Sequence, residues 1–248
     1  MTTRSTPTDD GPAVGPGPLP PGGFDRVARV YHALERLAFG STLERARFAH
    51  LTALTGCRDV LVLGDGDGRC VARLASMLPE ARIRCVDGSA GMLARLQARL
   101  TPSDRTRISC EQADIRTVAL PARSYDSVLT MFVLDCLTDE EVARLAPRVA
   151  AALRPGGQWL FADFSIPARG WRRLRARLWV ALLYAFFRWT TGLAVSSLPA
   201  SEAHIREAGL TPGSTLTFQQ GLIRSVLFEA PPTVRPRADE RTQRPPGC

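Results

Sequence analysis

The sequence contains no lysine and no asparagine, so all 32 of its basic residues are arginine, against 24 acidic residues and a formal net charge of +8. A basic chain raises the question of a nucleic-acid partner. The complete replacement of lysine by arginine is typical of codon bias, however, and the chain has no Gly-Arg repeat and no nucleic-acid-binding module. We therefore expect no nucleic-acid partner.

Long apolar runs and paired cysteines are also absent. No run approaches the roughly 18 to 20 apolar residues that a membrane span needs, and the N-terminus lacks the pattern of a signal peptide. The three histidines lie far apart, and no C-x-x-C pair occurs among the six cysteines, which are Cys57, Cys70, Cys85, Cys110, Cys136 and Cys248. We expect no metal site and no disulfide framework, but reduced thiols in a cytoplasmic protein.

Both ends of the chain are poor in apolar residues. Residues 1–23 consist largely of Pro, Gly, Thr and Ser, and residues 231–248 are rich in Pro and Arg. Neither segment can bury enough apolar surface to offset the entropy of ordering, so both are predicted to be disordered. One domain over residues 24–230 remains.

Within that domain, short apolar runs alternate with segments of helical period. The runs are nearly continuous in apolar character, as strands covered on both faces must be, and they lie at residues 60–63, 83–86, 107–110, 127–131 and 158–162. This alternation predicts an α/β fold with a doubly wound, mostly parallel sheet. Residues 214–218 and 222–230 are too close for a parallel crossover, so they predict an antiparallel hairpin that completes a seven-stranded sheet.

The clearest chemical signal is the segment Val60-Leu-Val-Leu-Gly-Asp-Gly-Asp-Gly-Arg69, a strand that runs into three glycines and then a helix. Glycines there allow a sharp turn and a close approach to a ligand. Asp87 ends the second strand, where a carboxylate lies beside such a turn and can accept hydrogen bonds from both hydroxyls of a ribose. Together these features predict an adenosine-containing ligand.

The spacing of the glycines separates two families that bind such ligands. Gly64, Gly66 and Gly68 are separated by single residues, whereas the dinucleotide fingerprint has two residues before its third glycine. Three further motifs accompany the later strands: Ala113-Asp114-Ile115 follows the third strand, Tyr125-Asp-Ser-Val128 begins the fourth, and Leu153-Arg-Pro-Gly-Gly157 begins the fifth. In these motifs the chain resembles class I S-adenosylmethionine-dependent methyltransferases over residues 24–230. Within that family it most resembles the group of ubiquinone and menaquinone C-methyltransferases, through Phe24-Asp-Arg-Val-Ala-Arg-Val-Tyr31 before the core and through Ala208-Gly-Leu210 and Gly221-Leu-Ile near the end.

The resemblance implies a set of site residues for S-adenosylmethionine. They are Tyr31, Gly64, Asp65, Gly66, Gly68, Asp87, Gly88, Asp114, Ile115, Met131 and Phe132. Asp87 would hold the ribose hydroxyls, Asp114 the adenine amino group, and Met131 with Phe132 the methionine end. The chain departs from the family at Val62, where an acidic residue that orients the cofactor is common. Either the affinity for the cofactor is reduced, or the role of that acid passes to Asp65 or Asp67.

The sulfonium methyl group of this cofactor is already activated, so orientation does most of the catalytic work, and a base is needed only for an acceptor that must lose a proton. Asp135, after the fourth strand, is the candidate base, and a helix-capping or surface aspartate is the alternative. Two rival functions remain: a nicotinamide-dependent oxidoreductase and a non-catalytic S-adenosylmethionine-binding protein.

Residues 164–200 contain six arginines and no acidic residue. Apolar residues recur at helical spacing there, at Trp171, Leu174, Leu178, Leu182, Ala185 and Trp189. One interpretation is a lid that lines the acceptor pocket, and the other is peripheral contact with an anionic membrane through residues 169–189. Both predict a small apolar acceptor, quinone-like or lipid-like.

Overall fold

The computed structural model describes residues 40–167, 169–191 and 197–232, and for residues 182–191 it describes the helical backbone alone. The tail predicted at residues 1–23, nearly all of the one at 231–248, and Tyr31 lie outside these residues. The strands are β1 (Asp59–Leu63), β2 (Arg82–Asp87), β3 (Ile108–Gln112), β4 (Tyr125–Met131), β5 (Leu153–Phe164), β6 (Thr211–Phe218) and β7 (Ile223–Glu229). The helices are α2 (Thr42–Phe48), α3 (Arg69–Met77), α4 (Ala90–Arg99), α5 (Asp139–Ala152), α6 (Trp171–Thr191) and α7 (Ser201–Glu207).

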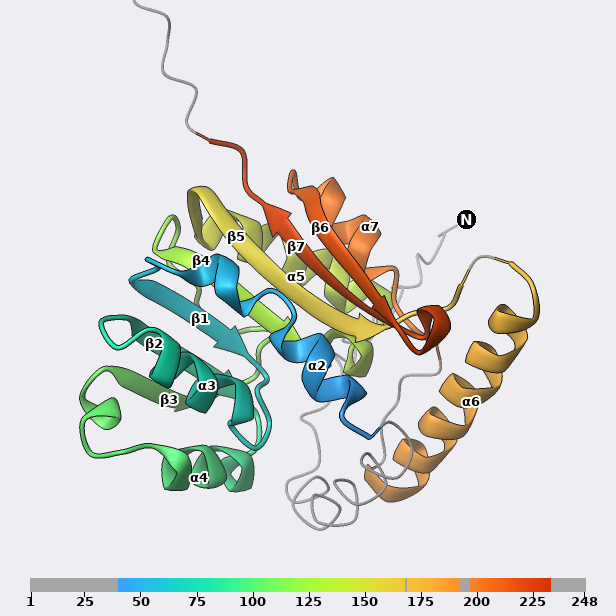
Figure 1. Ribbon diagram of the computed structural model, residues 1–248, viewed down its shortest axis with the longest axis horizontal. Coiled ribbons are helices and arrows are strands. Elements are labelled where there is room, and N and C mark those ends of the chain that lie inside the picture. Colours follow the sequence, from blue (N-terminus) through green and yellow to red (C-terminus); the bar gives the residue numbers. More distant parts are fainter. Residues whose placement is uncertain (1–39, 168, 192–196, 233–248) are drawn as a thin grey trace, which may run out of the picture.

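The seven strands form one sheet in the order β3-β2-β1-β4-β5-β7-β6. Strands β1 to β5 pair in parallel, while β7 is antiparallel to both β5 and β6 (Figure 1). The predicted α/β architecture is confirmed, including the hairpin that closes the sheet. All five carboxyl ends of the parallel strands therefore meet along one edge of the sheet, where α/β proteins bind their ligands.

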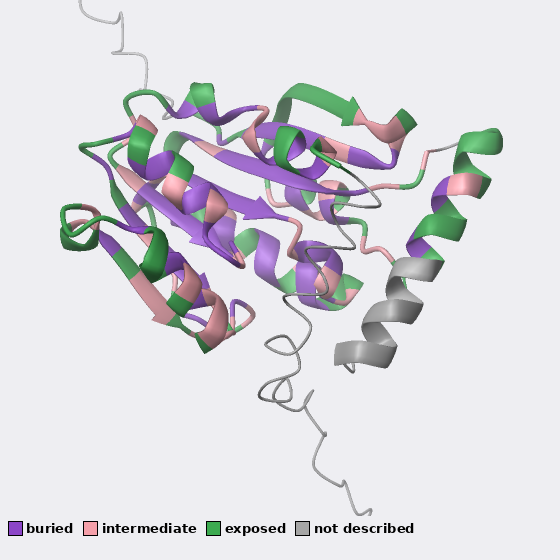
Figure 2. Ribbon diagram, turned by 60° about the horizontal axis from the view of Figure 1, so that its bottom comes forward, coloured by how far each residue is buried: buried purple, intermediate pink, exposed green. Residues whose placement is uncertain are grey.

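Helices cover both faces of this sheet. Helices α5 and α7 bury Val142, Leu145 and Ile205 against one face, and α3 and α4 bury Leu74 and Leu96 against the other. Helix α5 begins with the predicted capping box, in which the Thr138 hydroxyl accepts from the Glu141 N–H and the Glu141 carboxylate accepts from the Thr138 N–H. The central strands are therefore covered on both faces (Figure 2), which explains their continuous apolar sequences.

Two of the three loop glycines are required by packing. Gly64 and Gly68 both have positive φ, at 67° and 84°. A Cβ on Gly64 would lie 2.3 Å from a methyl carbon of Val133, and one on Gly68 would lie 2.6 Å from the backbone Cα of Leu96 in α4. These glycines thus let the loop approach the turn after β4 and let α3 approach α4.

Of the two interpretations of residues 164–200, a lid whose apolar residues line a pocket does not fit the part of α6 whose side chains are described. Trp171, Leu174 and Leu178 are 62%, 75% and 61% exposed. The inward residues are instead Ala176 and Val180, which pack with residues of α2 and β7. Because α6 is apolar on several sides, helical spacing alone could not identify the face that packs inward.

Expectations from the sequence also concern the cysteines, metal-binding groups and membrane-spanning helices. Cys57, Cys70, Cys85, Cys110 and Cys136 are free thiols. Among residues 40–167, 169–191 and 197–232, no group of three or more His, Cys, Asp or Glu side chains is arranged to hold a metal ion. Within the same described part of the chain, no helix combines the length and apolarity needed to cross a membrane.

Candidate active site

The loop after β1 and the end of β2 form the first part of the candidate site. The Gly66 N–H donates to Oδ2 of Asp87 at 3.1 Å, and the Ser89 N–H donates to Oδ1 at 2.9 Å. Gly66 has a φ of 64°, and a Cβ added to it or to Gly88 would meet no atom within 4 Å. Unlike Gly64 and Gly68, these two glycines border open space, so a ligand can approach the backbone there.

The Asp87 carboxyl group is partly desolvated at this edge. Burial raises its pKa above the ordinary value, although the two backbone N–H donors oppose the shift by stabilising the anion. A carboxylate has about four acceptor positions, and the two N–H groups use only some of them. Asp87 can therefore accept hydrogen bonds from a pair of hydroxyl groups.

Asp65 has a different environment from the other predicted loop residues. It is buried, and its two oxygens accept the N–H groups of Cys70 and Val71 in the first turn of α3, at 3.2 and 2.9 Å. Burial raises its pKa to about 7. Its carboxyl group thus caps α3 and supports the loop from within, while Val62, at the position where the family commonly has an acid, is fully buried in the sheet.

Asp114 follows β3 and is held by a neighbouring arginine. The Arg116 guanidinium donates to both Asp114 oxygens at 2.6 to 2.9 Å and also reaches Glu141 in α5. Partial burial works to raise the pKa of Asp114, but Arg116 outweighs it and the pKa is lowered. An adenine amino group would have to share this carboxylate with the guanidinium. Ile115 is buried in the core between the sheet and α5.

Met131 and Phe132 lie at the end of β4. Met131 is buried, and Phe132 is half-buried with a φ of 58°, an unusual conformation for a residue with a large side chain. The Phe132 N–H donates to the Ala162 carbonyl at 2.7 Å, and its ring lies 5.5 Å from that of Phe164 and 5.3 Å from the Arg47 guanidinium carbon. The unusual backbone conformation of Phe132 therefore places its ring beside Phe164, where β4 and β5 end.

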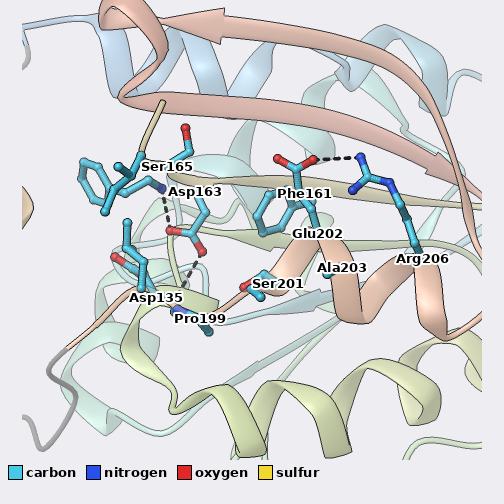
Figure 3. A pocket seen from close by; sticks show the side chains of 13 residues that line it. Asp135, Phe161, Asp163, Ser165, Pro199, Ser201, Glu202, Ala203 and Arg206 are labelled. Atoms are coloured by element: carbon cyan, nitrogen blue, oxygen red, sulfur yellow. Dashed lines mark hydrogen bonds and ion pairs between the residues drawn. The ribbon is translucent and has the colours of Figure 1, made fainter. Parts of the chain in front are cut away.

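A pocket of about 390 Å³ opens at the carboxyl ends of β4 and β5. Its walls come from the turn Leu134–Cys136 after β4, from β5 and the residues after it, and from α7 (Figure 3). The apolar lining residues are Phe161, Phe164, Ile166, Leu198, Pro199, Ala200 and Ala203, and the polar ones are Asp135, Asp163, Ser165, Ser201, Glu202 and Arg206. The described residues of α6 do not line it.

Asp135 is a pocket residue, and the alternative of a surface aspartate is wrong because only 6% of it is exposed. Its backbone N–H donates to Oδ2 of Asp163 at 3.0 Å. Asp163, which is also buried, is not among the site residues predicted from the sequence. The available signal was its position, since it is the acidic residue that interrupts the apolar run of β5 near the carboxyl end of that strand.

Part of the chain is similar in sequence to known methyltransferases. Residues 60–157 match the family described as a methyltransferase domain. The chain is 31% identical over 146 residues to the ubiquinone/menaquinone biosynthesis C-methyltransferase UbiE of Syntrophotalea carbinolica, an alignment that covers 58% of this chain and 60% of that protein. It is also 37% identical over 98 residues to a trans-aconitate 2-methyltransferase of Deinococcus radiodurans, covering 40% of this chain and 34% of the relative.

Solved structures share the fold. The N-methyltransferase NodS of Bradyrhizobium japonicum, determined in complex with S-adenosyl-L-homocysteine, aligns with a TM-score of 0.59 at 17% identity, over 85% of this chain and 99% of its own. The mitomycin 7-O-methyltransferase MmcR aligns with a TM-score of 0.60 at 21% identity, over 84% of this chain and 60% of its own.

Residues 60–157 are therefore similar to a methyltransferase domain, and one protein that shares the fold was determined with S-adenosyl-L-homocysteine, the demethylated form of S-adenosylmethionine. The residues at the β1–β2 edge suit this cofactor chemically. Asp87 offers a carboxylate acceptor for hydroxyl donors, and the open space at Gly66 and Gly88 leaves room beside the backbone. The chain spans about 60% of the length of the Syntrophotalea carbinolica relative.

Asp87 accepts two backbone N–H groups, whereas the Asp114 carboxylate is engaged by the Arg116 guanidinium through both of its oxygens. Asp87→Ala should weaken the binding of S-adenosylhomocysteine by about 1.5 to 3 kcal/mol, or roughly ten- to a hundred-fold, because it removes charge-assisted hydrogen bonds. Asp114→Ala should cost less than about tenfold, since Arg116 already engages that carboxylate. Calorimetric titration measures both affinities, and thermal unfolding verifies that both variants fold. A larger loss for Asp114→Ala than for Asp87→Ala would contradict the assignment.

Proposed function

We propose that this chain transfers a methyl group from S-adenosylmethionine to a small, predominantly apolar acceptor bound in the pocket between β5 and α7. The observation that carries this proposal is the arrangement along one sheet edge. The open backbone at Gly66 and the Asp87 carboxylate lie at the ends of β1 and β2, and the pocket begins at the ends of β4 and β5. Phe132 directly follows β4, between these two parts.

In this proposal each part of the edge has a distinct task. When bound, the cofactor supplies a methyl group on a positively charged sulfur. Asp87 orients the ribose, Gly64, Gly66 and Gly68 give the loop its shape, and Met131 with Phe132 flank the methionine end. Phe132 and Phe164 together exclude water between the two ligands. Holding the acceptor in line with the bond to be broken is worth several kcal/mol without a covalent intermediate.

The pocket chemistry bears on the class of acceptor. The UbiE relatives act in quinone biosynthesis and other relatives are trans-aconitate methyltransferases, as their names state. Trans-aconitate is a tricarboxylate, and such an anion would have to approach the buried carboxyl groups of Asp135 and Asp163. Like charges in a desolvated site repel strongly. A neutral, apolar acceptor of the quinone-like or lipid-like class is therefore favoured.

A pair of titrations separates this function from a nicotinamide-dependent oxidoreductase and from a protein without a cofactor site. Wild-type protein should bind S-adenosylhomocysteine and should not bind NADH when both are titrated calorimetrically. Incubation with S-adenosylmethionine carrying a labelled methyl group and neutral quinol-like acceptors should then transfer the label, which a non-catalytic binding protein would not do. Binding of NADH alone would refute the proposal.

The exposed face of α6 supports the proposed peripheral contact with an anionic membrane, on the cytoplasmic side where we expect the protein. Trp171, Leu174, Leu178 and Trp179 form an exposed or half-exposed apolar stripe. Arg172, Arg173 and Arg177 flank it, and no acidic residue occurs between residues 164 and 200. Aromatic side chains flanked by arginines suit the headgroup region of an anionic bilayer. Arg175 also lies on this helix, where its guanidinium donates to the Gln219 carbonyl and lies 5.6 Å from the centre of the Trp171 ring.

This contact predicts salt-sensitive binding to lipid vesicles. The triple variant Arg172→Gln, Arg173→Gln, Arg177→Gln should bind vesicles of anionic lipid more weakly by about 1 kcal/mol per arginine. Its affinity for S-adenosylhomocysteine should not change. The matched control replaces Arg73, Arg123 and Arg144, which are exposed on other parts of the molecule, and should bind vesicles like the wild type. If the wild type does not sediment with anionic vesicles at low salt, the membrane contact is wrong.

A further inference from the structure

The wall of the acceptor pocket contains a buried hydroxyl group at the start of α7. Ser201 is the first residue of that helix and is 5% exposed, and Figure 3 shows its side chain in the pocket wall between Asp163 and Glu202. Among the residues that the structure describes, the Ser201 hydroxyl group has no hydrogen-bond partner. Buried hydroxyl groups are nearly always hydrogen-bonded, so this one is available to a ligand in the pocket.

The other polar groups deep in the pocket are held by the protein itself. The hydroxyl group of Ser165, the second serine of the pocket wall, donates to the Gly221 carbonyl at 2.6 Å. The Asp163 carboxyl group accepts the N–H groups of Asp135 and Phe164 at 3.0 and 2.8 Å. Ser201 differs from Ser165 in that its hydroxyl group is not engaged by a described backbone carbonyl.

Arg206 also lines the pocket, but it is less suited to recognise a ligand oxygen. Its guanidinium pairs with Glu202 at 3.1 Å and lies 5.9 Å from the centre of the Phe228 ring. The Arg206 side chain is 46% exposed, so its remaining N–H groups reach solvent. Water competes less for the buried Ser201 hydroxyl, and a hydrogen bond from it contributes more to selectivity.

The start of α7 is fixed against α5, which holds Ser201 in position. The N–H group of Ala200, the residue before Ser201, donates to one oxygen of Asp139 at 2.7 Å, and His204 pairs with the other oxygen at 3.1 Å. Ile205 is fully buried in the core on the same side of the sheet as α5. A donor whose position is set before the ligand binds loses little freedom on binding, so it discriminates well between ligands.

We propose that Ser201 determines the specificity for the methyl acceptor, because its hydroxyl group donates a hydrogen bond to an oxygen atom of that acceptor. This inference rests on the proposed function, and it adds that the apolar acceptor carries a carbonyl, ether or hydroxyl oxygen. A purely hydrocarbon ligand would exclude water from the pocket and leave the Ser201 hydroxyl without a partner, so it would bind less well. Phe161 and Ala203 supply apolar surface for the rest of the acceptor.

The probes 1-tetralone and tetralin test this assignment, since they share one carbon frame and differ in a single carbonyl oxygen. Equilibrium dialysis with S-adenosylhomocysteine present measures both affinities. In Ser201→Ala the ratio of the affinity for 1-tetralone to that for tetralin should fall about three- to tenfold from the wild-type ratio, because one neutral hydrogen bond is lost. Ser201→Cys should show a similar fall without leaving a cavity, because a thiol donates only weakly.

The matched control is Ser165→Ala, which removes a pocket hydroxyl group that already donates to Gly221. Its affinity ratio should equal that of the wild type, whatever its thermal stability. An unchanged ratio in both Ser201 variants, an equal fall in Ser165→Ala, or failure of the wild type to bind 1-tetralone would overturn the inference. Binding of S-adenosylhomocysteine is measured on the same samples. A wild type that binds it and gives one of these results contradicts the role of Ser201 alone, whereas a wild type that does not bind it contradicts the proposed function itself.

Discussion

The hydrogen bond from the Gly66 N–H to the Asp87 carboxylate is the contact on which the candidate site depends. It joins the loop after β1 to the end of β2 and fixes the carboxylate beside open backbone. Two neighbouring contacts help to hold the loop in this conformation. The Asp65 carboxylate caps the first turn of α3, and the absence of a side chain at Gly68 lets α3 pack closely against α4. The open backbone at Gly66 and the Asp87 carboxylate thus lie side by side, where both can contact the same ligand.

Several buried or half-buried acids lie at the carboxyl edge of the sheet. Asp65, Asp87, Asp135 and Asp163 all lie at the ends of parallel strands, and burial raises the pKa of each. An acid with a folded-state pKa above its unfolded value destabilises the native state as it ionises, so for Asp65 stability falls as the pH rises from 3.8 towards about 7. These acids therefore lower the stability of the folded state at neutral pH. They lie at the sheet edge where we propose that the cofactor and the acceptor bind.

The fold and half of the site could be predicted from the sequence, because the signals there are local. Continuous apolar runs identify the parallel strands, and the glycine loop followed by Asp87 identifies the cofactor edge. Asp163 could not be found this way, since its pairing with Asp135 depends on how β4 and β5 lie side by side. Similarly, α6 is apolar on several sides, so its sequence does not reveal that Ala176 and Val180 are the residues that pack inward.

The most direct test of the account is a crystal structure of the protein with S-adenosylhomocysteine. The account predicts that the two ribose hydroxyls lie within hydrogen-bonding distance of Asp87. It also predicts that the sulfur atom faces Phe132 and the mouth of the pocket that holds Asp135 and Asp163. A structure in which the ribose lies away from Asp87, or in which the adenosine end fills the pocket between β5 and α7, would contradict it.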